Sequence, residues 1–170
     1  KISAYFQGDL KGKTIALWGL AFKPGTDDMR EAPSRFLMEA LWEQGALVRA
    51  YDPHAMVVTQ DIYGVRNDLM LCGTKEAALV SADILVVCTE WKPFWSPDFT
   101  HIKQTLNYPV IFDGRNLYDP KRLQEQGIQY FGIGRRNFTE DGDRLPISDI
   151  SKTSSAKSTL ETSTLEKAHY

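Results

Sequence analysis

Short apolar runs alternate along the chain with segments whose apolar residues recur at helical spacing. Residues 14–18 form one such run, as in a strand buried in a parallel sheet. Residues 33–44 are typical of a helix that begins at Pro33 and stops at Gly45. By the same reasoning, further strands are expected at residues 47–51, 84–88, 110–112 and 128–131, and further helices at residues 74–80, 99–106 and 119–126. This β-α-β-α-β-α-β-α-β order predicts an α/β fold: an open, mostly parallel sheet of about five strands with helices on both faces.

Ligands of such sheets bind outside the carboxyl ends of the strands, where the strand order reverses. With the usual order, that point lies between the first and fourth strands, so the loops of interest are residues 19–31 and 113–118. The first loop starts at Gly19 but lacks the other two glycines of the GxGxxG turn that holds a dinucleotide. The fold is therefore expected to be Rossmann-like without the usual means of holding NAD. Asp52, near where a ribose-binding carboxylate is expected, is interpreted as part of an ordinary Asp-Pro turn.

Composition and charge narrow the classes of function. The 170 residues carry 20 Lys and Arg against 22 Asp and Glu, a net charge of −2. A general binder of nucleic acid or of membrane surfaces would be basic, so neither partner is expected. No apolar run approaches the roughly 20 residues that span a bilayer, and the opening residues lack the apolar segment of a signal peptide. Cys72 and Cys88 are too few for a disulfide scaffold, and a cytoplasmic protein is expected.

The other polar and aromatic clusters favour structural roles. The three histidines are scattered and lack the cysteine or carboxylate spacing of a metal site, so no metal is expected. Asp27 and Asp28 are interpreted as residues that cap or charge-complement a helix start, or that pair with Arg30 or Arg35. Trp91 and Trp95 are expected to pack internally or against another subunit.

Four stretches in succession are more specific than any single feature. They read GLAFKPGTDDMREAPS (residues 19–34), YDPHA (51–55), ADILVVCTEW (82–91) and VIFDGRNLYD (110–119). Together they resemble the C-terminal domain of the UDP-glucose/GDP-mannose dehydrogenase family, in particular its bacterial UDP-glucose 6-dehydrogenases. The similarity runs in register from about Phe6 to Arg135.

The resemblance implies the nucleotide-sugar-binding half of an NAD-dependent enzyme, which oxidises UDP-glucose to UDP-glucuronate in two steps with two NAD+. Residues 13–147 are then the nucleotide-sugar-binding domain, and residues 1–12 are a linker from an upstream part of the parent protein. In the family, the catalytic cysteine and the main NAD site lie on that upstream part. No catalytic residue is therefore expected in this chain, which should be inactive alone. The N-terminal NAD-binding domain and further copies of the enzyme are the implied protein partners.

The resemblance also assigns residues to the site. It implies that Phe22 and Lys23 line the UDP-sugar pocket, that Arg115 contacts the nucleotide sugar, and that Arg30 reaches the NAD bound to the other domain. The chemistry agrees, because Lys23 and Arg115 can offset the charge of a diphosphate, and an Arg fork matches phosphate oxygens. Both loops are also the ones that the strand order selects.

Two alternatives stay open. A stand-alone, non-catalytic module could use the same pocket for UDP-sugars, and a related dehydrogenase could act on GDP-mannose or an N-acetylated UDP-sugar. The contacts that distinguish these sugars are expected upstream of this chain. Residues 148–170 include ten Ser or Thr among 23 residues, a composition that predicts a disordered tail.

Overall fold

The computed structural model describes residues 1–134, which fall into two units. The first unit, Lys1–Asp9, contains one short helix, α1 (Ile2–Tyr5). The second unit begins at Leu10 and contains the sheet and the remaining helices. The expected tail at residues 148–170 and the end of the expected domain at residue 147 lie outside the described residues.

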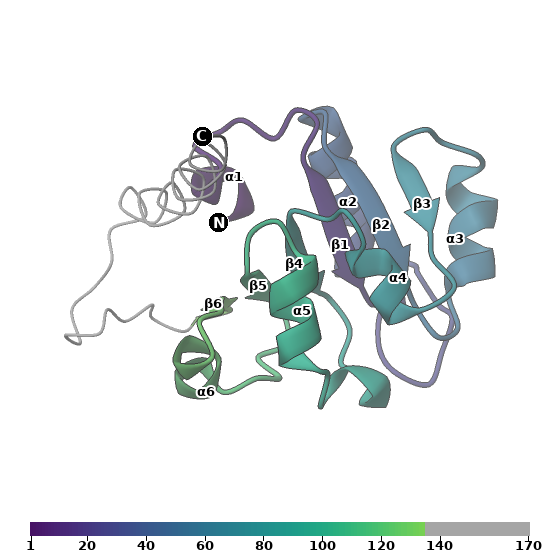
Figure 1. The fold of residues 1–170 in the computed structure, drawn as a ribbon. Coiled ribbons are helices and arrows are strands. Elements are labelled where there is room, and N and C mark those ends of the chain that lie inside the picture. The colour runs from purple at the N-terminus through teal and green to yellow at the C-terminus, as the bar shows by residue number, and fades with distance from the viewer. Residues whose placement is uncertain (135–170) are drawn as a thin grey trace, which may run out of the picture. The chain divides into compact units, whose positions relative to one another are not determined.

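The second unit is built on six parallel strands in the order β3-β2-β1-β4-β5-β6 (Figure 1). The strands are β1 (Thr14–Trp18), β2 (Leu47–Tyr51), β3 (Leu69–Leu71), β4 (Ile84–Val87), β5 (Val110–Asp113) and β6 (Gln129–Gly132). Every residue of β4 and β5 is buried, because helices cover both faces of the sheet. This explains why these strands read as unbroken apolar runs rather than as alternating ones. The order reverses between β1 and β4, and the expectation of a Rossmann-like fold is confirmed.

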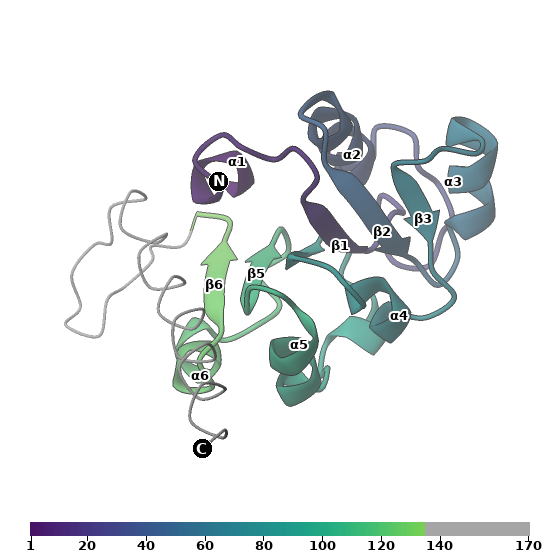
Figure 2. The ribbon, with the colours of Figure 1, turned by 45° about the horizontal axis from the view of Figure 1, so that its top comes forward.

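The helices form one layer on each face of the sheet (Figures 1 and 2). On one face lie α2 (Pro33–Glu43) and α3 (Met56–Tyr63). On the other lie α4 (Lys75–Leu79), α5 (Phe99–Thr105) and α6 (Pro120–Glu125), and a 3-10 turn, η1 (Lys92–Phe94), follows β4. Thr74, Asp98 and Asp119 begin α4, α5 and α6 by accepting hydrogen bonds from backbone N–H groups of the first turn.

Among the strands and α-helices of the second unit, two are absent from the sequence-based prediction, β3 and α3. β3 is a three-residue edge strand with no fully buried residue, so it lacks an apolar run. α3 includes Val57, Val58 and Thr59, β-branched residues that weaken a helical pattern. Because β3 was not predicted, residues 110–112 were expected to be the fourth strand. In the structure the fourth strand is Ile84–Val87, so the strand order reverses between β1 and this strand, and the expected position of the reversal is wrong. The loop after β4, residues 88–98, flanks that point, and residues 113–118 follow the next strand, β5.

Candidate functional site

The loops after β1, β4 and β5 pack backbone against backbone at the carboxyl edge of the sheet. Gly19 has a φ of +91°, and a Cβ there would lie 2.6 Å from the backbone nitrogen of Thr89. A Cβ on Gly114 would lie 2.9 Å from the carbonyl oxygen of Val87. Only glycine permits approaches this close, so these two positions bring the three loops together.

Asp52 ties the end of β2 to the same loops. Its side chain is buried, and Oδ2 accepts hydrogen bonds from the backbone nitrogens of Leu20 (2.7 Å) and Ala21 (3.0 Å). The indole nitrogen of Trp91 donates to the same oxygen at 2.9 Å. Oδ1 accepts two further backbone N–H groups from its own turn, both at 2.8 Å. Asp52 thus does form a turn, but it also holds the loops after β1 and β4.

The carbonyl groups of the loop after β1 also form hydrogen bonds, as its N–H groups do. The hydroxyl of Ser34 donates to the carbonyl of Leu20 at 2.5 Å, and that of Thr89 to the carbonyl of Ala21 at 2.6 Å. The backbone nitrogen of Phe22 donates to the carbonyl of Asp28 at 2.8 Å, which closes the loop on itself. The loop therefore presents the Phe22 side chain, 48% exposed, from a fixed backbone.

Arg115 reaches this loop from the end of β5. Its Nε donates to the carbonyl of Cys88 at 2.7 Å, and its Nη2 donates to the carbonyl of Phe22 at 2.9 Å. Nε also lies 3.0 Å from a carboxylate oxygen of Glu90. The structure therefore brings Phe22 and Arg115 into direct contact, although they are 93 positions apart in the sequence.

Lys23 is the next residue along the loop, and its side chain is exposed. Within residues 1–134 it forms no hydrogen bond or ion pair. Its ammonium group is therefore available to a ligand, whereas the guanidinium of Arg115 is already anchored at Nε and at Nη2.

Arg30 is held in a different way, by a single carboxylate. Its Nη2 lies 2.7 Å from an oxygen of Asp28, and its Nε lies 3.0 Å from the other oxygen. Hydrogen bonds from Arg30, assisted by its charge and by that of Lys23, lower the pKa of the Asp28 carboxyl to about 2. Asp28 therefore pairs with Arg30, whereas the residue that begins α2, Ala32, provides no side-chain cap.

Arg30 also lines an open hollow of about 380 Å³ between its loop and α3, together with Thr26, Asp27, Asp28, Met29, Arg35, Val58 and Ile62. In the described part of the chain, no hydrogen bond joins Arg30 to Phe22 or to Arg115. The four predicted site residues thus form two groups. Phe22 and Arg115 are in contact, Lys23 follows Phe22, and Arg30 pairs with Asp28 instead.

The residues of this unit do not fit a whole NAD molecule. A dinucleotide would need a carboxylate near the end of β2 for its ribose. Asp52 is in that region, but it is 1% exposed and both of its oxygens already accept hydrogen bonds. The loop after β1 also offers no helix N-terminus with a close glycine turn, since α2 begins only at Pro33.

The two cysteines are poorly suited to nucleophilic chemistry. Both are buried, and burial raises the pKa of the Cys88 thiol to about 12 and also raises that of Cys72. A nucleophilic cysteine needs the opposite shift, toward the thiolate. Among residues 1–134, no group of three or more His, Cys, Asp or Glu side chains could hold a metal ion. In the same range, no helix is both long and apolar enough to cross a bilayer.

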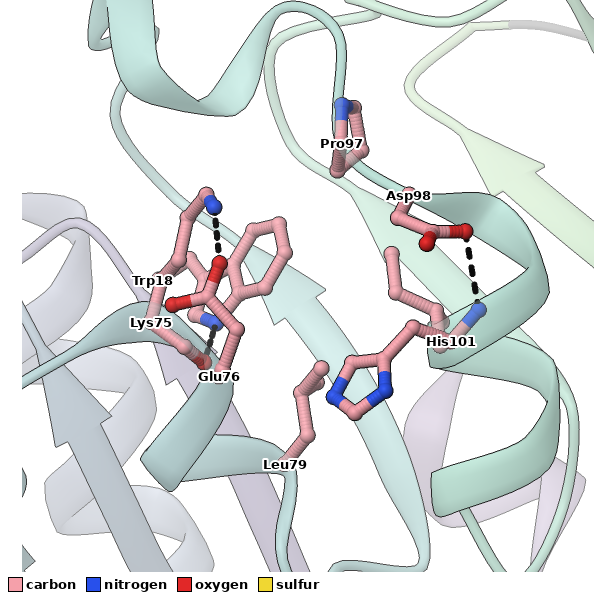
Figure 3. Close-up of a pocket in the computed structure, with 8 residues that line it drawn as sticks. Trp18, Lys75, Glu76, Leu79, Pro97, Asp98 and His101 are labelled. Carbon is pink, nitrogen blue, oxygen red and sulfur yellow. Dashed lines mark hydrogen bonds and ion pairs between the residues drawn. The ribbon is translucent and has the colours of Figure 1, made fainter.

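A second hollow of about 250 Å³ lies between α4 and α5, on the face of the sheet opposite α2 (Figure 3). Lys75 and Glu76 form an ion pair there, and the indole nitrogen of Trp18 donates to the carbonyl of Lys75. Asp98 accepts from the backbone nitrogen of His101. These polar groups therefore already have partners, and none of the predicted site residues lines the hollow.

An open parallel sheet with cationic side chains at its carboxyl edge defines a Rossmann-like domain of a kind that can bind anionic ligands. The profile of the UDP-glucose/GDP-mannose dehydrogenase family, UDP binding domain, matches residues 16–120, and the chain belongs to this family. The match includes Phe22, Lys23, Arg30 and Arg115.

The chain is also similar to named dehydrogenases and to a solved dehydrogenase structure. The chain is 51% identical over 133 residues to a UDP-glucose 6-dehydrogenase of Pseudomonas aeruginosa, covering 76% of this chain and 29% of that protein. It is 38% identical over 135 residues to the enzyme of the same name from Rhizobium meliloti, covering 79% and 30%. A UDP-glucose dehydrogenase structure from Pyrobaculum islandicum is 28% identical, with a TM-score of 0.62 over 78% of this chain and 28% of that one. The chain therefore spans less than a third of the length of these relatives.

Sequence reasoning missed Glu90, and it missed the contacts that Asp52 makes with the site loops. Glu90 follows a strand whose position in the order was misjudged, so its approach to Arg115 could not be expected. Asp52 carried a usable signal, because an acid at the end of a buried strand must find hydrogen-bond donors. The sequence alone could not show that those donors come from the loops after β1 and β4.

Proposed function

We propose that this chain is the nucleotide-sugar-binding part of an NAD-dependent UDP-glucose 6-dehydrogenase, which oxidises UDP-glucose to UDP-glucuronate with two NAD+. Its site is formed by Phe22, Lys23 and Arg115. The diphosphate lies against the two cations, and the exposed ring of Phe22 packs on the ligand. The names of the curated relatives support glucose as the sugar.

The hydrogen bond from Arg115 to the carbonyl of Phe22 is the observation that carries this proposal. It joins the two loops that bear all three residues, at the edge where sheets of this kind bind ligands. Arg115 still has Nη1 to offer, because the hydrogen bonds of its side chain in the described residues use Nε and Nη2. A guanidinium fixed in this way can contact a phosphate with little loss of side-chain entropy.

We propose that an NAD-binding part of the enzyme outside the described residues completes its active site. An N-terminal domain of the same protein holds NAD and supplies the catalytic thiol, and Arg30 reaches that NAD from its exposed loop. This division agrees with the poor fit of this unit to a dinucleotide and with the raised pKa of the Cys88 thiol. We further propose that residues 1–12 link the two domains, that the domain ends near residue 147, and that the enzyme works as a homo-oligomer in the cytoplasm.

UDP binding tests the site. The dissociation constant of UDP is measured by calorimetry for the 170-residue chain and for Lys23→Ala and Arg115→Ala. Each charge-assisted contact to phosphate is worth about 1.5–3 kcal/mol, so each change should weaken binding by about one to two decades. Arg30→Ala should leave UDP binding nearly unchanged. Lys103→Ala is the matched control, because it removes a cation from the last turn of α5, at the opposite edge of the sheet.

Wild-type affinity in both Lys23→Ala and Arg115→Ala would refute the site. Tighter binding of GDP-mannose than of UDP-glucose, in titrations with these two ligands, would refute the assigned nucleotide. The chain alone should reduce no NAD+ in the presence of UDP-glucose, since the hydride-acceptor site and the thiol nucleophile are proposed to lie elsewhere. Turnover that survives repurification would show that the proposed division of the enzyme is wrong.

A further inference from the structure

Glu90 places a negative charge directly beside the cation of the proposed site. It lies three residues after the end of β4, and one of its carboxylate oxygens is 3.0 Å from Nε of Arg115. This oxygen is buried, yet within residues 1–134 it accepts no hydrogen bond. The reason is that Nε carries a single hydrogen, which is directed at the carbonyl of Cys88. The contact between Glu90 and Arg115 is therefore one of charge alone.

The hydrogen bonds that orient Arg115 do not involve Glu90. Two backbone carbonyls, those of Cys88 and Phe22, hold its guanidinium at Nε and Nη2. What Glu90 adds is a charge that offsets the positive potential of the guanidinium. The two side chains are 29% and 39% exposed, so water screens part of this effect but does not remove it.

We propose that Glu90 sets the charge preference of the diphosphate site and favours a sugar nucleotide over the corresponding free nucleotide. This inference rests on the proposed function. In a sugar nucleotide both phosphates are esterified, and the diphosphate carries two charges. Free UDP ends in a phosphate whose last ionisation lies near pH 6, so at about pH 8 it carries three charges, and UTP carries four.

A carboxylate next to Arg115 repels each of these charges, so it disfavours the free nucleotides more. At a separation of about 6 Å, one added ligand charge changes affinity about threefold in water, and a more distant charge changes it less. Glu90 therefore keeps the site open for the substrate in the presence of nucleotides that carry more charge.

The test is a set of titrations with UDP-glucose, UDP and UTP at about pH 8 and low salt, using the 170-residue chain and its Glu90→Gln variant. Glutamine keeps the size of the side chain and removes the charge. All three ligands should bind more tightly to the variant, and the gain should grow with the charge of the ligand, by at most about threefold for each added charge. The differences should shrink at about 0.5 M salt. Glu43→Gln is the matched control, since it removes the same charge at the far end of α2 and should leave the ratios unchanged.

Each outcome decides between explanations. An equal gain for the three ligands, or no gain, would overturn the inference. Weaker binding of all three together with a lower melting temperature would show that Glu90 supports the loops instead. If wild-type chain binds UDP but Arg115→Ala binds it equally well, the proposed site is at fault. If wild-type chain binds none of the ligands, the proposed function fails, and the charge preference fails with it.

Discussion

Arg115 and Arg30 are both arginines on loops at the carboxyl edge of the sheet, but they are held by different means. Arg115 is half-buried and is fixed by the carbonyls of Cys88 and Phe22, which come from two other loops. Arg30 has a side chain that is 88% exposed, and its partner is Asp28, two residues earlier in the same loop. The first arrangement depends on the whole sheet, and the second depends on a few neighbouring residues.

The difference indicates separate roles. A guanidinium fixed by tertiary contacts suits a site that must present one geometry to a small ligand. A guanidinium on an exposed loop, released by breaking one surface ion pair, suits a contact that forms only when another body arrives. This agrees with the proposal that Arg115 binds the nucleotide sugar and that Arg30 reaches a cofactor held by another domain.

An aspartate-to-asparagine substitution at Asp52, beside the Arg115 site, and at Asp28, beside Arg30, should give the largest difference in stability between the two regions. Asp52→Asn replaces a buried carboxylate that accepts five N–H groups with an amide whose nitrogen can accept none of them. The free energy of unfolding should fall by about 3–5 kcal/mol, measured by urea denaturation. Asp28→Asn is the control and should cost much less, because Asp28 is partly exposed and, among the described residues, its carboxylate accepts hydrogen bonds only from Arg30 in its own loop. Equal effects of the two changes would remove the distinction between the regions.

The next largest difference in stability is expected between alanine substitutions at a glycine of each region. Gly19→Ala would place a Cβ 2.6 Å from Thr89 in a backbone with positive φ, so it should destabilise the fold by about 3 kcal/mol. Gly25→Ala, in the loop that carries Arg30, has a φ of +81° but no atom within 4 Å of the new Cβ. Only the conformational cost of about 1 kcal/mol remains there. Thermal unfolding of both variants measures the difference, and a Gly19→Ala protein as stable as Gly25→Ala would contradict the close packing of the loops.

The two regions also differ in how well the sequence alone predicted them. The longer strands and helices followed from apolar periodicity and from signals such as Pro33, and the four family motifs identified the site loops. Arg30 and Asp28 were recognisable as a possible pair because their contact is local. The short edge strand β3 has no apolar pattern, and missing it displaced the expected reversal of strand order.

The contacts of Arg115 could not be predicted from the sequence, because they depend on which loops the sheet brings together. No local pattern links residue 115 to residue 22, or Asp52 to Trp91, since these contacts span 93 and 39 positions. Glu90 became interpretable only once β4 was placed beside β1 and β5. Residues held by tertiary contacts thus need the topology first, whereas residues held by their neighbours can be read directly.

A smaller effect should appear in the reactivity of Cys88, whose carbonyl accepts the hydrogen bond from Arg115. In the native chain this buried thiol, with its pKa raised to about 12, should react very slowly with a disulfide reagent at neutral pH. Arg115→Ala should increase the rate severalfold, because the loops after β1, β4 and β5 lose a shared contact, while Arg30→Ala should not change it. Peptide mapping by mass spectrometry distinguishes Cys88 from Cys72. An equal rate in the two variants would mean that Arg115 does not hold these loops closed.

The smallest effect concerns the ion pair of the exposed loop. The pKa of Asp28 is lowered to about 2 from an ordinary value of 3.8, chiefly by hydrogen bonds from Arg30. Because the folded-state pKa is the lower one, the pair is complete above about pH 4 and is lost as the pH falls toward 2. NMR titration of the Asp28 carboxyl should show this midpoint, and Arg30→Ala should return it toward 3.8. Lys23→Ala, which removes only a more distant charge, should shift it less. A wild-type midpoint near 3.8 would mean that Arg30 is already free in solution, and the contrast with Arg115 would then be larger than the structure shows.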